Sequence, residues 1–344
     1  RRDMNKNIEI SGIGIDYPSY GKVDYDSLRK YYQDKKIRIK SLMKILGKNG
    51  RFTGNNSDEY YKLMENASKE SIKAAGININ DLDMIVVATD TPEYLSPTNA
   101  LRITNILQAK NVKVAFDMNA NCAAGIISLD QVSSYMKENT TINNALVICA
   151  FMGSYVFTSE NPISYCTFSD GVSAIVLKKA ESSYGIIDTN YVTDSSYMEM
   201  DVIPASGFSE ILRNEKRHDE DLKLGMDQGL DISFIPEIWS KQLENLFAKN
   251  KLTPEEISQY IFSQFSLYHI KSTIQKLHLS SEHYTYVGDK YGYTGECSPI
   301  FALYDAKKSR KIKTGDYIVL CGIGAGYTSA AMLYRVGKDD LNIL

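Results

Sequence analysis

One cysteine, Cys122, stands in a stretch that suits nucleophilic chemistry. It lies in the run DMNANCAAG at residues 117–125, between an apolar run at residues 112–116 and a helix-like run at residues 126–136. A thiol at a strand-to-helix turn meets free backbone N–H groups and the positive end of the helix dipole, and both favour a thiolate. The position therefore predicts a sulfur with a lowered pKa that attacks a thioester.

The other four cysteines give no comparable signal. Cys149 and Cys321 lie inside strand-like runs, which is typical of small buried side chains. The five cysteines are far apart in the sequence, and no C-x-x-C pair suggests zinc or a redox dithiol. We therefore predict no metal site and no disulfide framework.

The chain has four histidines, and we interpret each of them first as a solvated surface side chain. His278 and His283 flank a loop, and His269 lies on a predicted helix, where we expect it to face outward. His218 belongs to a polar, irregular segment at residues 189–229, which either covers a site or forms mobile surface. Glu296 is either an acid near the site or a first-turn residue favoured by a helix dipole.

Composition excludes several classes of protein. The 344 residues carry a net charge of −3 with no basic stripe, so nucleic acid is not an expected partner. The longest apolar runs are strand-length, well short of the ~20 residues of a membrane span, and no apolar h-region follows the first residues. We predict a cytoplasmic protein with no membrane partner.

The elements that must position Cys122 alternate between strands and helices. Helical periodicity is clear at residues 57–75 and 234–248. Unbroken Val/Ile runs predict central strands covered on both faces, and the alternation predicts an α/β protein. The predicted strands lie at residues 8–13, 84–89, 112–117, 145–150, 173–177, 184–188, 260–264, 283–287, 317–321 and 330–334.

The two halves of the chain look alike in the order of their elements. In each half a strand leads into a glycine-containing turn and a helix, at residues 117–125 in the first half and 286–299 in the second. No linker-like composition separates them. We therefore predict an N-terminal half at residues 8–180, which carries Cys122, and a C-terminal half at residues 181–344.

Seven stretches together resemble β-ketoacyl-acyl carrier protein synthase III, a family of the thiolase fold. They are ISGIG at 10–14, SPTNA at 96–100, DMNANCAAG at 117–125, FSDGVSA at 168–174, KYGYT at 290–294, IKTGD at 312–316 and GIGAGYT at 322–328. The resemblance implies two duplicated halves with five-stranded mixed sheets, stacked as α/β/α/β/α layers. It also implies a Cys122 nucleophile and an oxyanion turn at Gly324, Ala325 and Gly326.

Two positions depart from the family pattern. The segment IFSQFS at residues 261–266 stands where the family has I-P-H-Q-A-N, so Ser263 replaces the catalytic histidine. Tyr293 replaces the asparagine of the family's G-N-T motif. By this resemblance Ser263 and Tyr293 join Cys122 as candidate catalytic residues, and Gln264, Phe265 and Ser266 are candidate substrate-binding residues.

The departures leave three possible functions open. In the first, Cys122 takes an acyl group from acyl-CoA or a phosphopantetheine-linked acyl carrier protein and passes it to an acceptor, with decarboxylative condensation impaired. In the second, the chain is a degenerate partner in a heterodimer with an active paralogue. In the third, condensation persists through groups that the sequence does not identify.

The resemblance also implies partners but no permanently bound cofactor. Acyl-CoA or acyl carrier protein is the expected substrate, and the chain is expected to form a homodimer or a heterodimer with a paralogue. A small basic cluster at residues 35–40 is either a contact for coenzyme A or a carrier protein, or a solvated face.

Overall fold

The unbroken apolar run at residues 84–89 forms a central strand, as predicted. All five side chains of β4 (Met84–Ala88) are buried, and β4 pairs in parallel with a strand on each side. The structure is a computed structural model that describes residues 6–199, 201–213, 218–226, 231–338 and 340–344.

Five strands form the first sheet, in the order β1-β7-β6-β4-β5. Their bounds are Lys6–Asp16 for β1, Gly171–Glu181 for β7, Asn144–Phe151 for β6, Met84–Ala88 for β4 and Val114–Met118 for β5. The β6-β4-β5 part is parallel, whereas β7 is antiparallel to both β1 and β6. The first sheet is therefore mixed, with β5 at its edge.

The second sheet repeats this order with one strand fewer. Its strands run β8-β13-β12-β11. Their bounds are Gly185–Thr193 for β8, Thr328–Arg335 for β13, Tyr317–Gly324 for β12 and Ile257–Phe262 for β11. The antiparallel β8-β13-β12 part and the parallel β12-β11 pair match β1-β7-β6-β4 in direction. The predicted duplication is thus visible in the topology.

The predicted strand at residues 283–287 is absent, so the second sheet has four strands and not five. A 3₁₀ turn, η7 (Ser281–His283), is followed by one parallel bridge between Tyr260 and Tyr284. Glutamine side chains form hydrogen bonds with backbone groups of this segment that would otherwise pair with a neighbouring strand. Gln264 bonds to Thr285 O and Val287 N, and Gln259 donates to Glu282 O.

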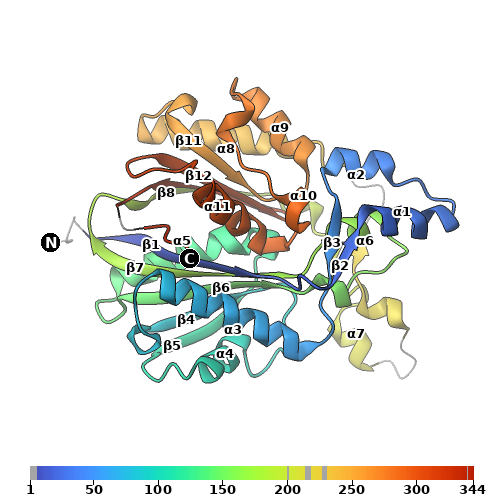
Figure 1. Ribbon diagram of the computed structural model, residues 1–344, viewed down its shortest axis with the longest axis horizontal. Coiled ribbons are helices and arrows are strands. Elements are labelled where there is room, and N and C mark those ends of the chain that lie inside the picture. The colour runs from blue at the N-terminus through green and yellow to red at the C-terminus, as the bar shows by residue number, and fades with distance from the viewer. Residues whose placement is uncertain (1–5, 200, 214–217, 227–230, 339) are drawn as a thin grey trace.

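Helices fill three layers around the two sheets (Figure 1). Helices α3 (Ser57–Ala74) and α4 (Asn99–Leu107) cover the outer face of the first sheet. Helices α5 (Ala124–Glu138) and α11 (Ser298–Lys308) lie between the sheets, in the largest core cluster. Helices α8 (Ile235–Asn250) and α9 (Leu267–Lys276) cover the second sheet. The layers are α/β/α/β/α, as the resemblance implied.

Glycines in β1 set how closely α3 packs. A Cβ on Gly12 would lie 2.2 Å from Ser71 O, and one on Gly14 would lie 2.2 Å from Ala67 O. Both carbonyls belong to α3, so only glycine permits this approach. The apolar face of α3 is buried against the sheet through Tyr60, Leu63, Met64, Ala67 and Ile72.

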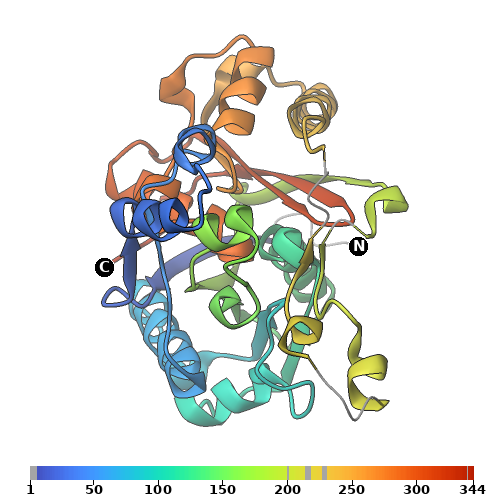
Figure 2. The same cartoon turned by 90° about the vertical axis from the view of Figure 1, so that its right-hand side faces the viewer.

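Two excursions from the sheets lie at the same end of the molecule (Figures 1 and 2). The first contains β2 (Lys22–Asp24), α1 (Tyr25–Asp34), α2 (Lys40–Leu46) and β3 (Gly50–Phe52). The second contains η4 (Ser195–Tyr197), β9 (Asp201–Val202), α7 (Phe208–Arg213), η5 (Asp219–Leu222) and β10 (Gly225–Met226). The predicted irregular segment thus holds short elements.

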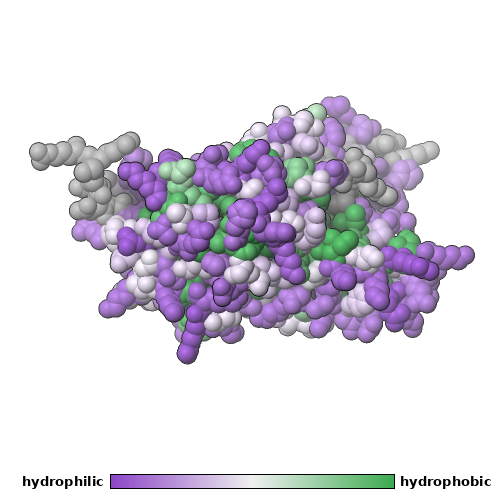
Figure 3. Space-filling model, turned by 90° about the horizontal axis from the view of Figure 1, so that it is seen from above, coloured by the Kyte–Doolittle hydropathy of each residue, from purple (hydrophilic) through white to green (hydrophobic). Residues whose placement is uncertain are grey.

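Four other short elements are η1 (Ile79–Asp81), η3 (Gly153–Tyr155), α6 (Pro162–Thr167) and η6 (Pro254–Glu256). The strands of the first sheet end at or before Glu181, and the first strand of the second sheet begins at Gly185. The domain boundary at residues 180 and 181 stays a prediction. None of the described helices is long and apolar enough to cross a bilayer. The face in Figure 3 is mainly hydrophilic, with apolar side chains scattered between polar ones.

Candidate active site

Cys122 lies at the predicted strand-to-helix turn. Strand β5 ends at Met118, Cys122 belongs to the 3₁₀ turn η2 (Asn121–Ala123), and α5 begins at Ala124. Asn121 holds the turn in a left-handed conformation with φ of 49°, and its Nδ2 donates to Ala325 O at 2.7 Å. Of the five cysteines Cys122 alone is not buried, so it is the one thiol open to a substrate.

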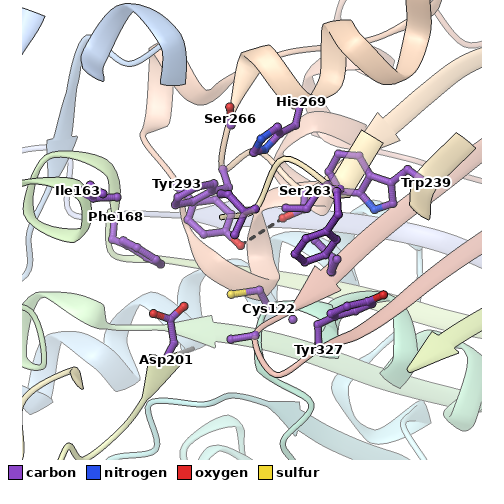
Figure 4. Close-up of a pocket in the computed structure, with 17 residues that line it drawn as sticks. Cys122, Ile163, Phe168, Asp201, Trp239, Ser263, Ser266, His269, Tyr293 and Tyr327 are labelled. Atoms are coloured by element: carbon purple, nitrogen blue, oxygen red, sulfur yellow. Dashed lines mark hydrogen bonds between the residues drawn. The ribbon is translucent and has the colours of Figure 1, made fainter. Parts of the chain in front are cut away.

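The structure brings the three candidate catalytic residues together. Ser263 directly follows β11, and Tyr293 follows the short helix α10 (Gly288–Tyr291). The Tyr293 hydroxyl hydrogen-bonds to the Cys122 sulfur and lies 3.2 Å from Ser263 Oγ (Figure 4). A chain of donors therefore runs from Ser263 through the phenol to the thiol.

The pKa of Cys122 is raised, whereas the sequence predicted a lowered pKa. Burial raises the pKa of the thiol well above its usual value, and the Asp90 carboxylate raises it further. The hydrogen bond from Tyr293 lowers this pKa, and the charges of Glu296 and Asp201 raise it. The predicted lowered pKa is therefore wrong, because three nearby carboxylates and desolvation outweigh the favourable turn.

The glycine-rich turn after β12 packs directly on the Cys122 turn. A Cβ on Gly324 would lie 2.8 Å from Ala120 O and 3.2 Å from Ala123 N. Gly324 and Ala325 line the pocket beside Cys122, whereas Gly326 has a φ of 117° that glycine adopts without strain. The turn thus lies where the resemblance placed an oxyanion site, and that role stays a prediction.

A pocket with aromatic walls opens on one side of Cys122 (Figure 4). We call it the apolar pocket. Its walls include Phe234 and Trp239 from the start of α8, and Tyr327 from the glycine-rich turn. The candidate residues Ser263, Phe265, Ser266 and Tyr293 also line it. Such a pocket suits an alkyl or pantetheine chain that approaches the thiol.

Gln264 differs from its neighbours Phe265 and Ser266. Its side chain is fully buried and bonds to Phe262 O, Thr285 O and Val287 N. These bonds occupy the amide inside the protein, and Gln264 does not line either pocket at Cys122. The amide therefore replaces a missing strand ladder, and substrate binding by Gln264 stays a prediction.

A second, smaller pocket also meets Cys122, and we call it the acidic pocket. Asp90 and Asp201 line it together with three phenylalanines, Phe151, Phe157 and Phe168. Burial raises the pKa of Asp90 to about 7 and that of Asp201 to about 6. Asp201 also lines the apolar pocket. The two pockets therefore join at Cys122.

Sequence reasoning missed both aspartates. Asp90 follows the parallel strand β4 by two residues, and Cys122 follows the neighbouring strand β5. The carboxyl ends of parallel strands meet at one sheet edge, and this signal could have indicated Asp90. Asp201 lies in an excursion whose course has no sequence signature, and nothing in the sequence indicated it.

The histidines are distributed differently from the prediction. His269 is buried on the inward face of α9 and lines the apolar pocket. Burial lowers its pKa to about 4, so it is neutral at pH 7. The expected outward orientation is wrong, because Ile270, Thr273 and Ile274 form the same buried face. His218 and His278 are exposed as expected, and His218 does not line either pocket at Cys122.

Glu296 is a buried acid near the site. It belongs to the 3₁₀ turn η8 (Gly295–Cys297), is completely buried, and has no hydrogen-bond partner for either carboxylate oxygen among the described residues. Burial raises its pKa well above the usual range, and the nearby Asp90 carboxylate adds to this. Across the described ranges no group of three or more His, Cys, Asp or Glu side chains is arranged to hold a metal ion.

The stacked α/β halves with a cysteine at the central turn define a protein of the thiolase fold. The family model described as 3-oxoacyl-[acyl-carrier-protein (ACP)] synthase III matches residues 116–195. The model of that family's C-terminal part matches residues 247–336.

Individual relatives agree with the family models. A β-ketoacyl-[acyl-carrier-protein] synthase III of Clostridium perfringens is 28% identical over 331 residues, which are 96% of this chain and 100% of that protein. The Aquifex aeolicus relative of the same name is 31% identical over 269 residues, 78% of this chain and 82% of its own. The crystal structure of 3-oxoacyl-[acyl-carrier-protein] synthase III from Aquifex aeolicus VF5, 26% identical, matches with a TM-score of 0.83 over 95% of this chain and 99% of its own. The chain belongs to the β-ketoacyl-acyl carrier protein synthase III family.

Proposed function

We propose that the chain is an acyl-thioester transferase. Cys122 takes an acyl group from acyl-CoA or acyl carrier protein and passes it to an acceptor. The observation that carries this proposal is that the one cysteine that is not buried lies where two pockets meet, beside Tyr293 and Ser263. The names of the relatives supply acyl carrier protein as the partner.

The loading step is a thioester exchange. The Cys122 sulfur attacks the thioester carbonyl carbon, a new S–C bond forms, and the C–S bond to the donor breaks. The proton of the Cys122 thiol leaves on the donor sulfur, which departs as a free thiol. The backbone N–H groups of Cys122 and of the turn at Gly324 are the proposed donors to the oxyanion.

Decarboxylative condensation is proposed to be impaired. Ser263 and Tyr293 offer neutral hydroxyl donors where the family pattern has histidine and asparagine. Loss of one aimed donor to an oxyanion typically costs about 10²–10³ in rate. The carboxylates of Asp90 and Asp201 also repel a malonyl carboxylate near Cys122. The acyl group is therefore proposed to move to an oxygen or nitrogen nucleophile, or to another carrier.

Intact-protein mass spectrometry tests the loading step. Incubation with a panel of acyl-CoA and acyl carrier protein donors is expected to add one acyl mass, and Cys122→Ala is expected to abolish it. Failure of every donor to form an adduct on Cys122 would contradict the proposal.

Carbon dioxide release from malonyl carrier protein tests the second step. Release is expected to be slow in the wild type and faster in the Ser263→His, Tyr293→Asn double variant. Fast release by the wild type would show that condensation persists through other groups.

The raised pKa of Cys122 favours a second candidate function. A thiol that stays protonated is a poor nucleophile, as expected of a degenerate partner in a heterodimeric ketosynthase. Co-purification with a second synthase-like chain, and unchanged activity of the pair with Cys122→Ala, would support this alternative over acyl transfer.

The proposed partners are a second copy or a paralogue, and a carrier protein. The edge strand β5 is available for pairing with a second copy or a paralogue. The basic residues 35–40 lie at the end of α1 and the start of α2, and most are exposed, in reach of a carrier protein. Lys35 pairs with Glu160 at 3.4 Å. The cytoplasmic location stays a prediction.

A further inference from the structure

We propose that the acidic pocket binds the positively charged end of the acyl group on Cys122, so that the chain transfers an amino-bearing acyl group and not a plain alkyl one. The juxtaposition that carries this inference is that of Asp90 and Asp201, from separate segments, in one cavity that opens onto the nucleophile. The inference rests on the proposed acyl transfer and adds the class of acyl group.

One oxygen of each carboxylate lacks a partner. Oδ1 of Asp90 and Oδ1 of Asp201 are shielded from solvent, and neither has a hydrogen-bond partner among the described residues. No ion pair within the described part of the chain includes either side chain. A buried carboxylate without a partner is costly, and proteins retain such groups mainly where a ligand or a mechanism uses them.

Glu296 adds a third carboxyl group at this place, and its burial favours the neutral form. It is completely buried, it lacks a side-chain partner among the described residues, and Asp90 is the charged group that acts on it most strongly. Asp90 and Asp201 are therefore the carboxylates that give the pocket its charge, and no cation among the described residues lines it. An ammonium group in the acidic pocket would supply the missing charge.

Each asparagine side chain of the pocket uses one of its amide atoms in a bond within the protein. Asn119 Oδ1 accepts from Asn121 N at 2.9 Å, and Asn121 Nδ2 donates to Ala325 O at 2.7 Å. These bonds shape the Cys122 turn. The aspartates are therefore the charged groups that remain to recognise a ligand.

The remaining walls suit a short carbon chain that ends in a cation. Phe151, Phe157 and Phe168 line the same pocket as the aspartates and Cys122. Aromatic rings pack against methylene groups, and their faces attract an organic cation. A neutral alkyl acyl group would leave both carboxylates unpaired, and an anionic one would be repelled.

A matched pair of donors tests the inference. β-Alanyl-CoA and butyryl-CoA have the same shape and differ by an ammonium group in place of a methyl group. Loading onto Cys122, followed by intact-protein mass spectrometry, is expected to be on the order of tenfold faster or more for β-alanyl-CoA, since a charge-assisted hydrogen bond forms. Equal or faster loading of butyryl-CoA would overturn the inference and leave the proposed acyl transfer intact.

Single variants assign the effect to the aspartates. Asp90→Asn and Asp201→Asn are each expected to lower the ratio of β-alanyl to butyryl loading severalfold. Asp219→Asn, an exposed aspartate of the same excursion as Asp201, is the matched control and should leave the ratio unchanged. A ratio that both pocket variants retain would overturn the assignment.

A binding measurement keeps the inference independent of turnover. If no donor loads, the proposed acyl transfer fails, and calorimetry on Cys122→Ala then compares binding of the same two thioesters. Tighter binding of β-alanyl-CoA than of butyryl-CoA supports the acidic pocket as a cation site, provided that the double variant Cys122→Ala/Asp90→Asn loses this difference. Equal or weaker binding overturns it.

Discussion

Tyr293 controls the Cys122 thiol through one hydroxyl. That hydroxyl bonds to the sulfur and lowers the pKa of Cys122, against the effect of burial and the carboxylates. We expect Tyr293→Phe to slow alkylation of Cys122 by iodoacetamide at pH 8 about fivefold, because a net hydrogen bond contributes about 1 kcal/mol. Peptide mass spectrometry measures the rate at Cys122 without interference, since the other four cysteines are buried.

An exposed tyrosine gives the control for this variant. Tyr268 on α9 is 57% exposed, and Tyr268→Phe should leave the alkylation rate unchanged. An unchanged rate in Tyr293→Phe would show that the phenol does not tune the thiol.

The raised pKa of Cys122 also predicts a pH dependence. The thiolate is the reactive form, so below its pKa the alkylation rate rises about tenfold per pH unit. We expect this rise to continue from pH 7 through pH 9. Asp90→Asn removes a charge that raises the pKa, so its curve should shift to lower pH. A wild-type plateau below pH 8 would contradict the assignment.

For single residues, the sequence predicts which residues form the candidate site better than it predicts the charges around them. It identified Cys122, Ser263 and Tyr293, which the structure brings into one chain of hydrogen bonds. It assigned Cys122 a lowered pKa, because a turn motif shows the helix dipole but not the carboxylates that other segments bring near. Asp201 comes from such a segment.

A buried lysine links elements of the two halves of the chain. Lys48, between α2 and β3, donates to Gln264 O and to Tyr286 Oη, the latter at 2.9 Å. Gln264 adjoins Ser263, so this contact ties the first excursion to the loop that carries a candidate catalytic residue. Burial lowers the pKa of Lys48 from its usual 10.5 to about 7.

The lowered pKa of Lys48 gives a stability prediction with a definite sign. Between pH 7 and about 10 the unfolded chain holds the lysine proton and the folded chain does not, so stability from this group rises with pH. The free energy of unfolding of the wild type, minus that of Lys48→Met, is therefore expected to increase with pH, by at most about 1.4 kcal/mol per unit. Urea unfolding of both proteins at several pH values measures it, and a flat difference would contradict it.

The sequence predicted strands well where the strand is a continuous run of apolar, buried residues. Every residue of β4 is apolar and buried, and its sequence permits little else. The strand expected at residues 283–287 failed for a different reason. The side chains of Gln259 and Gln264 take the backbone partners of that segment, and no local pattern shows such a long-range substitution.

The whole molecule leaves one edge of its first sheet open. Among the described residues, strand β5 pairs only with β4, and no other strand lies beside its outer backbone groups. Phe116 in the middle of β5 is 36% exposed, and Leu101 on the neighbouring helix α4 is 52% exposed. An exposed edge with apolar side chains is a template for pairing with another chain. A two-fold axis through this edge would join two copies by the same surface.

This edge predicts the oligomeric state. We expect the wild type to be a dimer at micromolar concentration, and Phe116→Glu to be a monomer, because the pairing would bury a charge without a partner. Size-exclusion chromatography with light scattering measures both masses. Tyr268→Glu places the same charge on α9, far from β5 in the layer order, and should remain dimeric. A dimeric Phe116→Glu would place the interface elsewhere, whereas a monomeric wild type would contradict the homodimer and favour a paralogue as the partner of β5.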